Sequence, residues 1–202
     1  MTPTQTQRRF SLALTGASGV VYGVRLLTVL AAKGCVVDLM VSESGAKCLQ
    51  LEMGLPGHPR ELVDALGLSR EQVRVHERNN IASPLASGSA LAGLSAGIIM
   101  PCSMGTCARI AQGISSNLIE RHADVLIKER KPFVLVPRET PLSPIHLENL
   151  LKLSRLGCHV VPASPGFYHR PEKVEDLVDH VVGKVLDIVG VEHDLYKRWQ
   201  GF

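Results

Sequence analysis

Short apolar runs alternate along the chain with longer segments that have apolar residues at spacings of three and four. The short runs are rich in leucine and β-branched residues without a clean polar alternation, as expected for parallel strands covered on both faces. They occupy residues 10–15, 36–41, 96–101, 132–137 and 158–163. The longer segments have helical periodicity and occupy residues 20–34, 44–53, 115–130, 143–157 and 171–190. This order predicts an α/β protein with a Rossmann-like (flavodoxin-like), doubly wound parallel sheet in three layers, α/β/α.

Composition narrows the class of protein. The 202 residues are enough for one domain with a single large core, and 45% of them are hydrophobic. A net charge of +3, spread along the chain, does not indicate a nucleic-acid surface. Five cysteines form no C-x-x-C pair, which is typical of a reducing cytosol. No stretch approaches the roughly 20 apolar residues of a membrane span. We therefore expect a flexible tail at 1–9, one domain at 10–202, a cytoplasmic location, and neither nucleic acid nor membrane as partner.

Small and hydroxyl-bearing residues follow several predicted strands, at the edge where ligands of such sheets bind. Gly16-Ala17-Ser18-Gly19 follows the first strand, Ser42 follows the second, and the segment PCSMGT follows a later one. Loops of this kind let backbone N–H groups at a helix N-terminus hold a phosphate. A tight β–α turn explains the glycines equally well, and a helix cap explains Ser103 and Thr106. A dinucleotide site is less favoured, because the third glycine of G-x-G-x-x-G is misplaced.

Arg138 and Glu139 follow the apolar run 132–137 directly. A buried cation beside a carboxylate at the ligand edge indicates phosphate binding together with acid–base work. The neighbouring Arg130 and Lys131 fit an ordinary solvated helix face. The eight histidines are scattered without an H-x-x-x-H pair, and no cysteine has a histidine at ligand spacing, so no metal site is predicted.

Aromatic residues gather near the C-terminus. Five of the eight fall after residue 166, namely Phe167, Tyr168, Tyr196, Trp199 and Phe202. They fit either a tail anchored on the core or on a neighbouring subunit, or an aromatic wall beside a planar or cationic ligand.

Several segments, taken together and in order, resemble the UbiX-type flavin prenyltransferases. They are TGASGVVYGVRLL, PCSMGT, KERKPFVLVPRETPLSPIHLENL, PGFYHRP and RWQG. The resemblance implies a homo-oligomer, typically a dodecamer, with active sites at subunit junctions. It also implies transfer of a dimethylallyl group from dimethylallyl monophosphate to N5 and C6 of reduced FMN. The prenylated FMN then serves a UbiD-type decarboxylase, in ubiquinone biosynthesis or aromatic acid decarboxylation.

The same resemblance implies which residues form the site. Those expected to contact FMN are Gly16, Ala17, Ser18, Ser42, Ser103, Met104, Gly105, Thr106 and Arg138. Those expected to hold the prenyl donor are Lys128, Arg138, Tyr168, Lys184 and Trp199, with Trp199 beside the prenyl chain. The catalytic set is Ser18, Glu52, Lys128 and Glu139. Ser18 would lie near flavin N5, Glu52 near the flavin, and Glu139 would protonate the departing phosphate.

The absence of an aspartate-rich Asp-Asp-x-x-Asp motif agrees with a reaction without a metal ion. Fixed cations such as Lys128, Arg138 and Lys184 can stabilise the leaving phosphate instead. Two alternatives remain: an FMN-dependent oxidative cysteine decarboxylase-like flavoprotein, and a non-catalytic FMN-binding subunit of a decarboxylase. Residues 54–80 are the least family-like, and no role is transferred to them.

Overall fold

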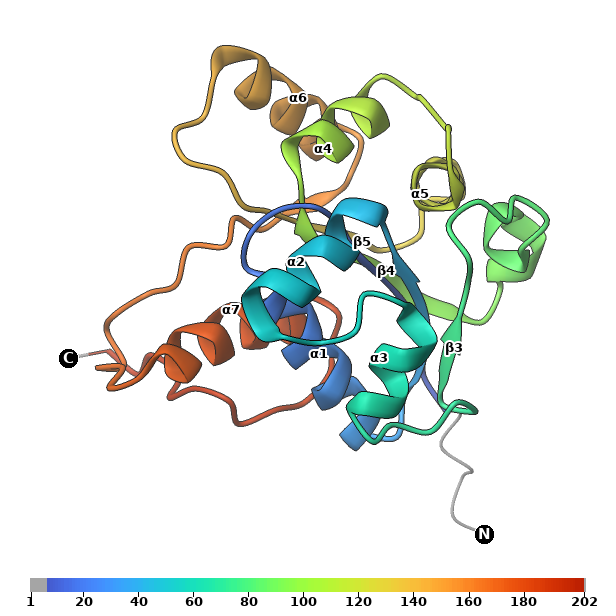
Figure 1. Ribbon diagram of the computed structural model, residues 1–202. Coiled ribbons are helices and arrows are strands. Elements are labelled where there is room, and N and C mark those ends of the chain that lie inside the picture. The colour runs from blue at the N-terminus through green and yellow to red at the C-terminus, as the bar shows by residue number, and fades with distance from the viewer. Residues whose placement is uncertain (1–6, 202) are drawn as a thin grey trace, which may run out of the picture.

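A six-stranded parallel sheet forms the centre of the computed structural model, which describes residues 7–201 (Figure 1). Its strands are β1 (Arg9–Leu14), β2 (Val36–Val41), β3 (Val73–Val75), β4 (Leu94–Cys102), β5 (Phe133–Pro137) and β6 (His159–Val160). The order across the sheet is β3-β2-β1-β4-β5-β6, and the pairings are parallel. The predicted doubly wound, Rossmann-like fold is confirmed, with the strand order reversing between β1 and β4.

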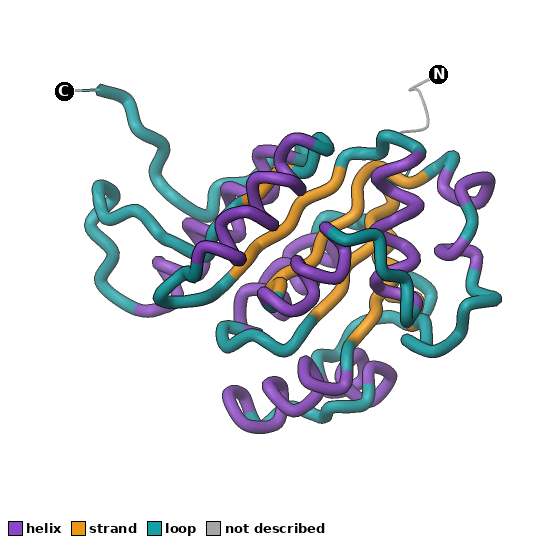
Figure 2. Tube along the Cα trace, turned by 90° about the horizontal axis from the view of Figure 1, so that it is seen from above, coloured by secondary structure: helices purple, strands orange, loops and turns teal. Residues whose placement is uncertain are grey.

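Helices cover both faces of this sheet (Figure 2). They are α1 (Val20–Ala32), α2 (Glu43–Met53), α3 (Pro59–Ala65), α4 (Met104–Ala111), α5 (Leu118–Lys128), α6 (Pro144–Arg155) and α7 (Val174–Ile188), with short 3₁₀ turns η1 (Pro84–Ala86) and η2 (Gly88–Leu91). The apolar pattern misses β3, α3 and α4, because each is too short to show a period. Helix α7 begins later than the predicted Pro171, because the Asp176 carboxylate accepts the N–H groups of Glu172 and Lys173 and fixes the helix start there.

Two apolar cores lie on the two faces of the sheet. The first packs α1, α3 and α7 against residues such as Leu12, and the second packs α4, α5 and α6 against residues such as Ala13. Successive residues of β1 thus enter opposite cores, which explains why the strand is apolar apart from Arg9 and Ser11. No helix within residues 7–201 has the length and apolarity of a membrane span.

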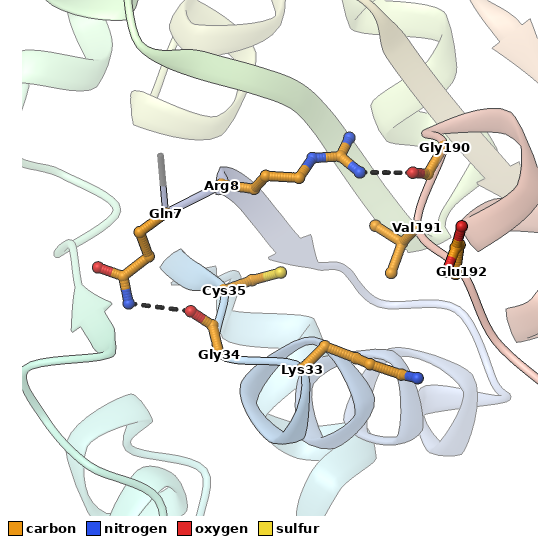
Figure 3. A pocket seen from close by; sticks show the side chains of 8 residues that line it. All are labelled: Gln7, Arg8, Lys33, Gly34, Cys35, Gly190, Val191 and Glu192. Atoms are coloured by element: carbon orange, nitrogen blue, oxygen red, sulfur yellow. Dashed lines mark hydrogen bonds between the residues drawn. The ribbon is translucent and has the colours of Figure 1, made fainter. Parts of the chain in front are cut away.

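The fold begins before the predicted boundary at residue 10. Arg9 opens β1, Arg8 donates to the carbonyl oxygens of Val189 and Gly190, and the Gln7 amide donates to Gly34 O at 2.9 Å (Figure 3). These contacts line a hollow of about 640 Å³ where α1 and α7 end, on the amino side of the sheet. Residues 7–9 of the expected tail are therefore part of the fold, and residues 1–6 lie outside the described residues.

Candidate functional site

The loop after β1 is tied to the loop after β4 through one buried side chain. The Thr15 hydroxyl donates to Pro101 O at 2.9 Å and accepts the Ser103 N–H at 2.8 Å. Ala17 is buried beside it, whereas Ser18 is exposed at the rim. The hydroxyl of Ser18 is thus presented to solvent on a loop whose backbone is fixed from below.

Glycines allow this loop to approach its neighbours closely. A Cβ on Gly16 would lie 2.2 Å from the Cβ of Ser44 at the start of α2, which is far inside contact distance. Gly19 has a φ of +99°, a left-handed value that favours glycine. The tight-turn interpretation of these glycines is therefore correct, and it is compatible with a ligand at the exposed rim.

Helices α1, α2 and α4 begin at this edge of the sheet, and a side chain caps each of them. Ser42 accepts the Gly45 N–H at 3.0 Å to cap α2, and Ser103 accepts the Thr106 N–H at 3.3 Å to cap α4. The carboxylate of Glu52 accepts the N–H groups of Gly19 and Val20, at 2.8 and 3.1 Å, at the start of α1. A carboxylate is favourable at a helix N-terminus. The carboxylate of Glu52 therefore fills the N-terminus of α1. The N-termini of α2 and α4 border a cavity instead.

This cavity, of about 270 Å³, lies between the loops after β1, β2 and β4. Its lining residues are Thr15, Gly16, Ser42, Glu43, Ser44, Arg78, Ser103, Thr106, Arg109, Asn117, Ile119 and Glu120. Four of the predicted FMN contacts, Gly16, Ser42, Ser103 and Thr106, are thus brought to one place. Met104 is buried in the core beneath, and Gly105 is exposed at the start of α4.

Two cations in this cavity were not anticipated from the sequence. Arg109 donates to Glu120 and to the Thr106 hydroxyl, and Arg78 donates to Glu43 at 3.1 Å. Burial acts to raise the pKa of Glu120, but hydrogen bonds from Arg109 and the Ser116 N–H outweigh it and lower that pKa, so Glu120 is anionic. Arg109 follows Thr106 by three residues, a spacing that places both on one helix face. Arg78 lies in an irregular region that offers no such signal.

Arg138 is brought to the glycine loop, as predicted. It follows β5, is half-buried, and donates from Nε to Ser18 O at 2.9 Å. Glu139 differs from the expectation of a buried acid. It is exposed and accepts the Thr140 N–H at 3.0 Å, because the chain turns outward after β5. A small cavity of about 130 Å³ lies beside both residues.

Lys128 lies at the opposite edge of the sheet from Ser18 and Arg138. It ends α5, a helix that runs antiparallel to the strands and returns the chain to the start of β5. Eleven helical residues span about 16 Å, so one end of α5 borders the cavity and the other does not. Lys128 pairs with Glu129, and nearby Lys131 donates to Ala92 O just before β4. Within one chain, Lys128 therefore lies far from the rest of the predicted site.

The remaining residues predicted to hold the prenyl donor gather around α7. The Tyr168 ring meets the rings of His169, His180 and Trp199 edge-on, with centroids 5.6, 5.7 and 5.6 Å apart. Tyr196 packs on His180 at 4.9 Å. We call these five residues the α7 cluster. A cavity of about 480 Å³ lies beside Tyr168 and Trp199. Lys184 is exposed on α7 one turn after His180.

The structure confirms that the C-terminal tail is anchored on the core, and the aromatic wall beside a ligand stays a prediction. The Tyr196 hydroxyl donates to Asp187 at 2.6 Å, which anchors the C-terminal segment, while Tyr168 and Trp199 line the cavity. Phe167 is exposed, and Phe202 lies outside the described residues. Within residues 7–201, no group of three or more His, Cys, Asp or Glu side chains is arranged to hold a metal ion.

Comparison with known proteins places these features in a family. The profile of the family described as Flavoprotein matches residues 2–186. A flavin prenyltransferase UbiX of Aquifex aeolicus (strain VF5) is 47% identical over 194 residues, which cover 96% of this chain and 100% of the relative. The structure of AnUbiX (PadA1) in complex with FMN and dimethylallyl pyrophosphate has a TM-score of 0.88 at 37% identity, covering 97% of this chain and 99% of that one. The dodecameric FMN-dependent Ubix-like decarboxylase from Escherichia coli O157:H7 has a TM-score of 0.86 at 39% identity, covering 96% and 100%. The chain therefore belongs to the Flavoprotein family and, within it, to the UbiX-type flavin prenyltransferases.

Proposed function

We propose that this protein transfers a dimethylallyl group from dimethylallyl monophosphate to N5 and C6 of reduced FMN without a metal ion. The observation that carries the proposal is the contact between Arg138 and Ser18, which joins the segment after β5 to the glycine loop beside a polar cavity. It occurs in a chain that is 47% identical to a flavin prenyltransferase along nearly its whole length. A glycine loop alone would support only the fold.

The donor set at this edge fits FMN. A phosphate monoester needs N–H donors and positive charge. The cavity has two guanidinium groups, each paired with a carboxylate, two hydroxyl-bearing caps and the first turns of α2, α4 and α5. The loop Gly16–Ser18 lies at the rim, with Ser18 exposed and Arg138 against it. We infer that the phosphate enters the cavity and the flavin ring lies over this loop. When bound, reduced FMN supplies the nucleophilic atoms for the transfer.

Two residues act on the flavin side in this proposal. Ser18 takes or relays the proton of N5, because its hydroxyl is exposed on a fixed backbone. Glu52 holds the Gly19 and Val20 N–H groups and thereby orients the loop that carries Ser18. Its carboxylate lies next to the region assigned to the flavin.

The donor side of the proposed site uses residues from more than one place. Arg138, Tyr168 and Lys184 hold the phosphate, Trp199 lies along the prenyl chain, and Lys128 adds a further cation. Since Lys128 ends α5 at the opposite edge, we propose that a second copy of the chain supplies it. The protein would then act as a homo-oligomer, such as a dodecamer, with its sites between copies. Glu139 is exposed in one chain, so burial by that second copy would convert it into a proton donor for the leaving phosphate.

The alternatives explain less of the site. An oxidative cysteine decarboxylase-like flavoprotein is expected to use a catalytic histidine, and among the described residues none of those that line the cavity is a histidine. A non-catalytic FMN-binding subunit has no use for the donor-side cations. We propose further that the product serves a UbiD-type decarboxylase and that the protein is cytoplasmic, which its five free cysteines support.

One experiment tests the activity directly. The protein is incubated without oxygen with reduced FMN and dimethylallyl monophosphate, in parallel samples with and without EDTA. The mass of the released flavin is then measured by mass spectrometry. The expected product is FMN heavier by one C5H8 unit, and inorganic phosphate is released with it. Unchanged flavin would overturn the proposed reaction, and activity that EDTA abolishes and Mg²⁺ restores would overturn its metal-free character.

A further inference from the structure

Two histidines of the α7 cluster have buried ring nitrogens without hydrogen-bond partners. The rings of His169 and His180 stack at 5.1 Å with an interplanar angle of 6°. His180 is 7% exposed, and its Nε2 and both nitrogens of His169 have no partner. Buried polar atoms of this kind are rare in folded proteins, since each one loses its hydrogen bonds to water. The arrangement therefore calls for an explanation other than core packing.

The other nitrogen of His180 has a specific partner. Nδ1 accepts the N–H of Gly166 at 3.2 Å, so the neutral ring carries its proton on Nε2. Gly166 lies two residues before Tyr168, and a Cβ on it would lie 3.2 Å from His180 Nε2 and 3.3 Å from Tyr168 Cδ1. The glycine is thus enclosed between the two rings. His180 contacts the segment that carries Tyr168 both at the backbone and at the ring.

We propose that His180 is a positioning residue for the prenyl donor: its neutral ring holds the Gly166 backbone and thereby fixes the Tyr168 ring on α7. This inference rests on the proposed function of Tyr168 in donor binding. If Nδ1 took a proton, it would become a donor facing the Gly166 N–H, which is also a donor, and the hydrogen bond between them would be lost. The position of Tyr168 therefore depends on His180 staying neutral.

The surroundings of His180 keep it neutral. Lys184 lies one turn along α7, His169 and Tyr168 face the ring from the segment after β6, and Tyr196 faces it from the C-terminal segment. Tyr196 is in turn bonded to Asp187, which also accepts from His193 and Arg198. Burial lowers the pKa of His180 below its usual 6.5, and the nearby His169 and Lys184 lower it further. The contact should thus persist at neutral pH and fail in mild acid.

The first test uses the protein without FMN or donor. Trp199 is the only tryptophan of the chain, and its ring lies against Tyr168, so its fluorescence reports on the cluster. Scanned from roughly pH 8 to 4.5, the wild type should show a transition with a midpoint below 6.5. His180→Phe should lack this transition, whereas His58→Asn, which removes an exposed histidine at the start of α3, should keep it. An identical transition in His180→Phe would overturn the proposal.

The second test separates the hydrogen bond from the ring packing. His180→Phe keeps a ring against Tyr168 but removes the acceptor, and His180→Asn keeps an acceptor oxygen near the place of Nδ1 but removes the ring. We expect His180→Phe to raise the donor KM about two- to tenfold with little change in kcat or FMN affinity, as loss of one hydrogen bond predicts. His180→Asn should stay within about twofold of wild type. The reverse order, or equal effects, would contradict positioning through Nδ1.

The two tests also separate this inference from the proposed function. A protein that titrates as expected but does not prenylate FMN would reject the proposed function while keeping the contact between His180 and Gly166. If His180→Phe does not fold, deuterium exchange at the Gly166 amide of the wild type decides. Its protection factor should fall as His180 takes a proton, and a protection factor that is constant with pH would contradict the proposal.

Discussion

The loops at the carboxyl ends of the strands and the α7 cluster are built in different ways. In the loops, glycines and helix caps fix the backbone, and the partners of Ser42 and Ser103 lie only three residues away. In the α7 cluster, rings pack on rings from segments that are distant in sequence, as Tyr168 does with Trp199. The difference teaches that short-range helix caps shape part of the proposed flavin side, although Thr15, Glu52 and Arg138 add long-range contacts to it. The proposed donor side depends on ring contacts between distant segments. FMN binding by the loops should therefore tolerate substitutions in the α7 cluster.

The largest effect is expected from Ser18→Ala, which tests whether the fixed loop carries chemistry. Turnover should fall by about 10²–10⁴-fold, the usual contribution of a general acid–base group. FMN affinity should change little, because Thr15 and Glu52 still hold the loop backbone. Stopped-flow single turnovers and FMN titration measure the two quantities. Ser154→Ala, at an exposed position on α6, is the matched control. Wild-type turnover in Ser18→Ala would show that the hydroxyl has no part in the chemistry.

Lys128→Ala should act on the donor and leave the flavin side intact. We expect the donor KM to rise by about 10- to 100-fold, since a charged hydrogen bond to phosphate is removed in both the ground state and the transition state. FMN affinity should stay as in the wild type. Lys33→Ala, an exposed lysine at the end of α1, serves as control and should change neither quantity. Steady-state kinetics with varied dimethylallyl monophosphate decides, and an unchanged KM would place the donor cation elsewhere.

Gly45→Ala should break the flavin side through the backbone. Its Cβ would lie 2.5 Å from Leu14 O at the end of β1, so α2 would have to move away from the cavity. Overpacking of this kind costs about 1–3 kcal/mol, which corresponds to a fall in Tm of roughly 2–10 °C. Gly93→Ala is matched, because nothing lies within 4 Å of its added Cβ. Calorimetry and FMN titration should show losses for the first variant alone; equal losses in both would mean that the close approach is unimportant.

Asp187→Asn should give the smallest effect and act on the donor side only. Burial acts to raise the pKa of Asp187, but hydrogen bonds from Arg198, Tyr196 and His193 outweigh it and lower this pKa to about 2. Because the folded-state pKa is below the usual value, ionised Asp187 stabilises the fold above about pH 4, and that contribution is lost as the pH falls toward 2. Asp187→Asn should remove this part of the acid transition and raise the donor KM about twofold. An acid unfolding curve identical to that of the wild type would contradict a stabilising role for the hydrogen bonds of Asp187 with the C-terminal segment.

Sequence patterns predict the flavin side better than the donor side, for physical reasons. Buried parallel strands are mostly apolar, so β1, β2, β4 and β5 are visible despite the buried Ser11 and Asp38. Their carboxyl ends locate Ser18, Ser42, Ser103 and Arg138. Strand β3 has three residues and α3 seven, too few for a period. The stack of His169 on His180 joins residues with no local pattern between them. The role of Arg78 is equally hard to predict from the sequence, because it reaches the cavity from an irregular segment.

The exposure of Glu139 and the placement of Lys128 could not be foreseen from the strand pattern, and the proposed function explains both by a site that two copies of the chain complete. The most direct test of this proposal mixes two variants, at a dimethylallyl monophosphate concentration well below the wild-type KM, where each variant alone is nearly inactive. Ser18→Ala and Lys128→Ala chains are co-expressed in equal amounts, and prenylated FMN is measured against each variant alone. If the site takes Ser18 from one copy and Lys128 from another, random assembly restores both residues in about one site in four, and activity should recover to about a quarter of wild type. Activity no higher than the mean of the two separate variants would contradict a site shared between copies.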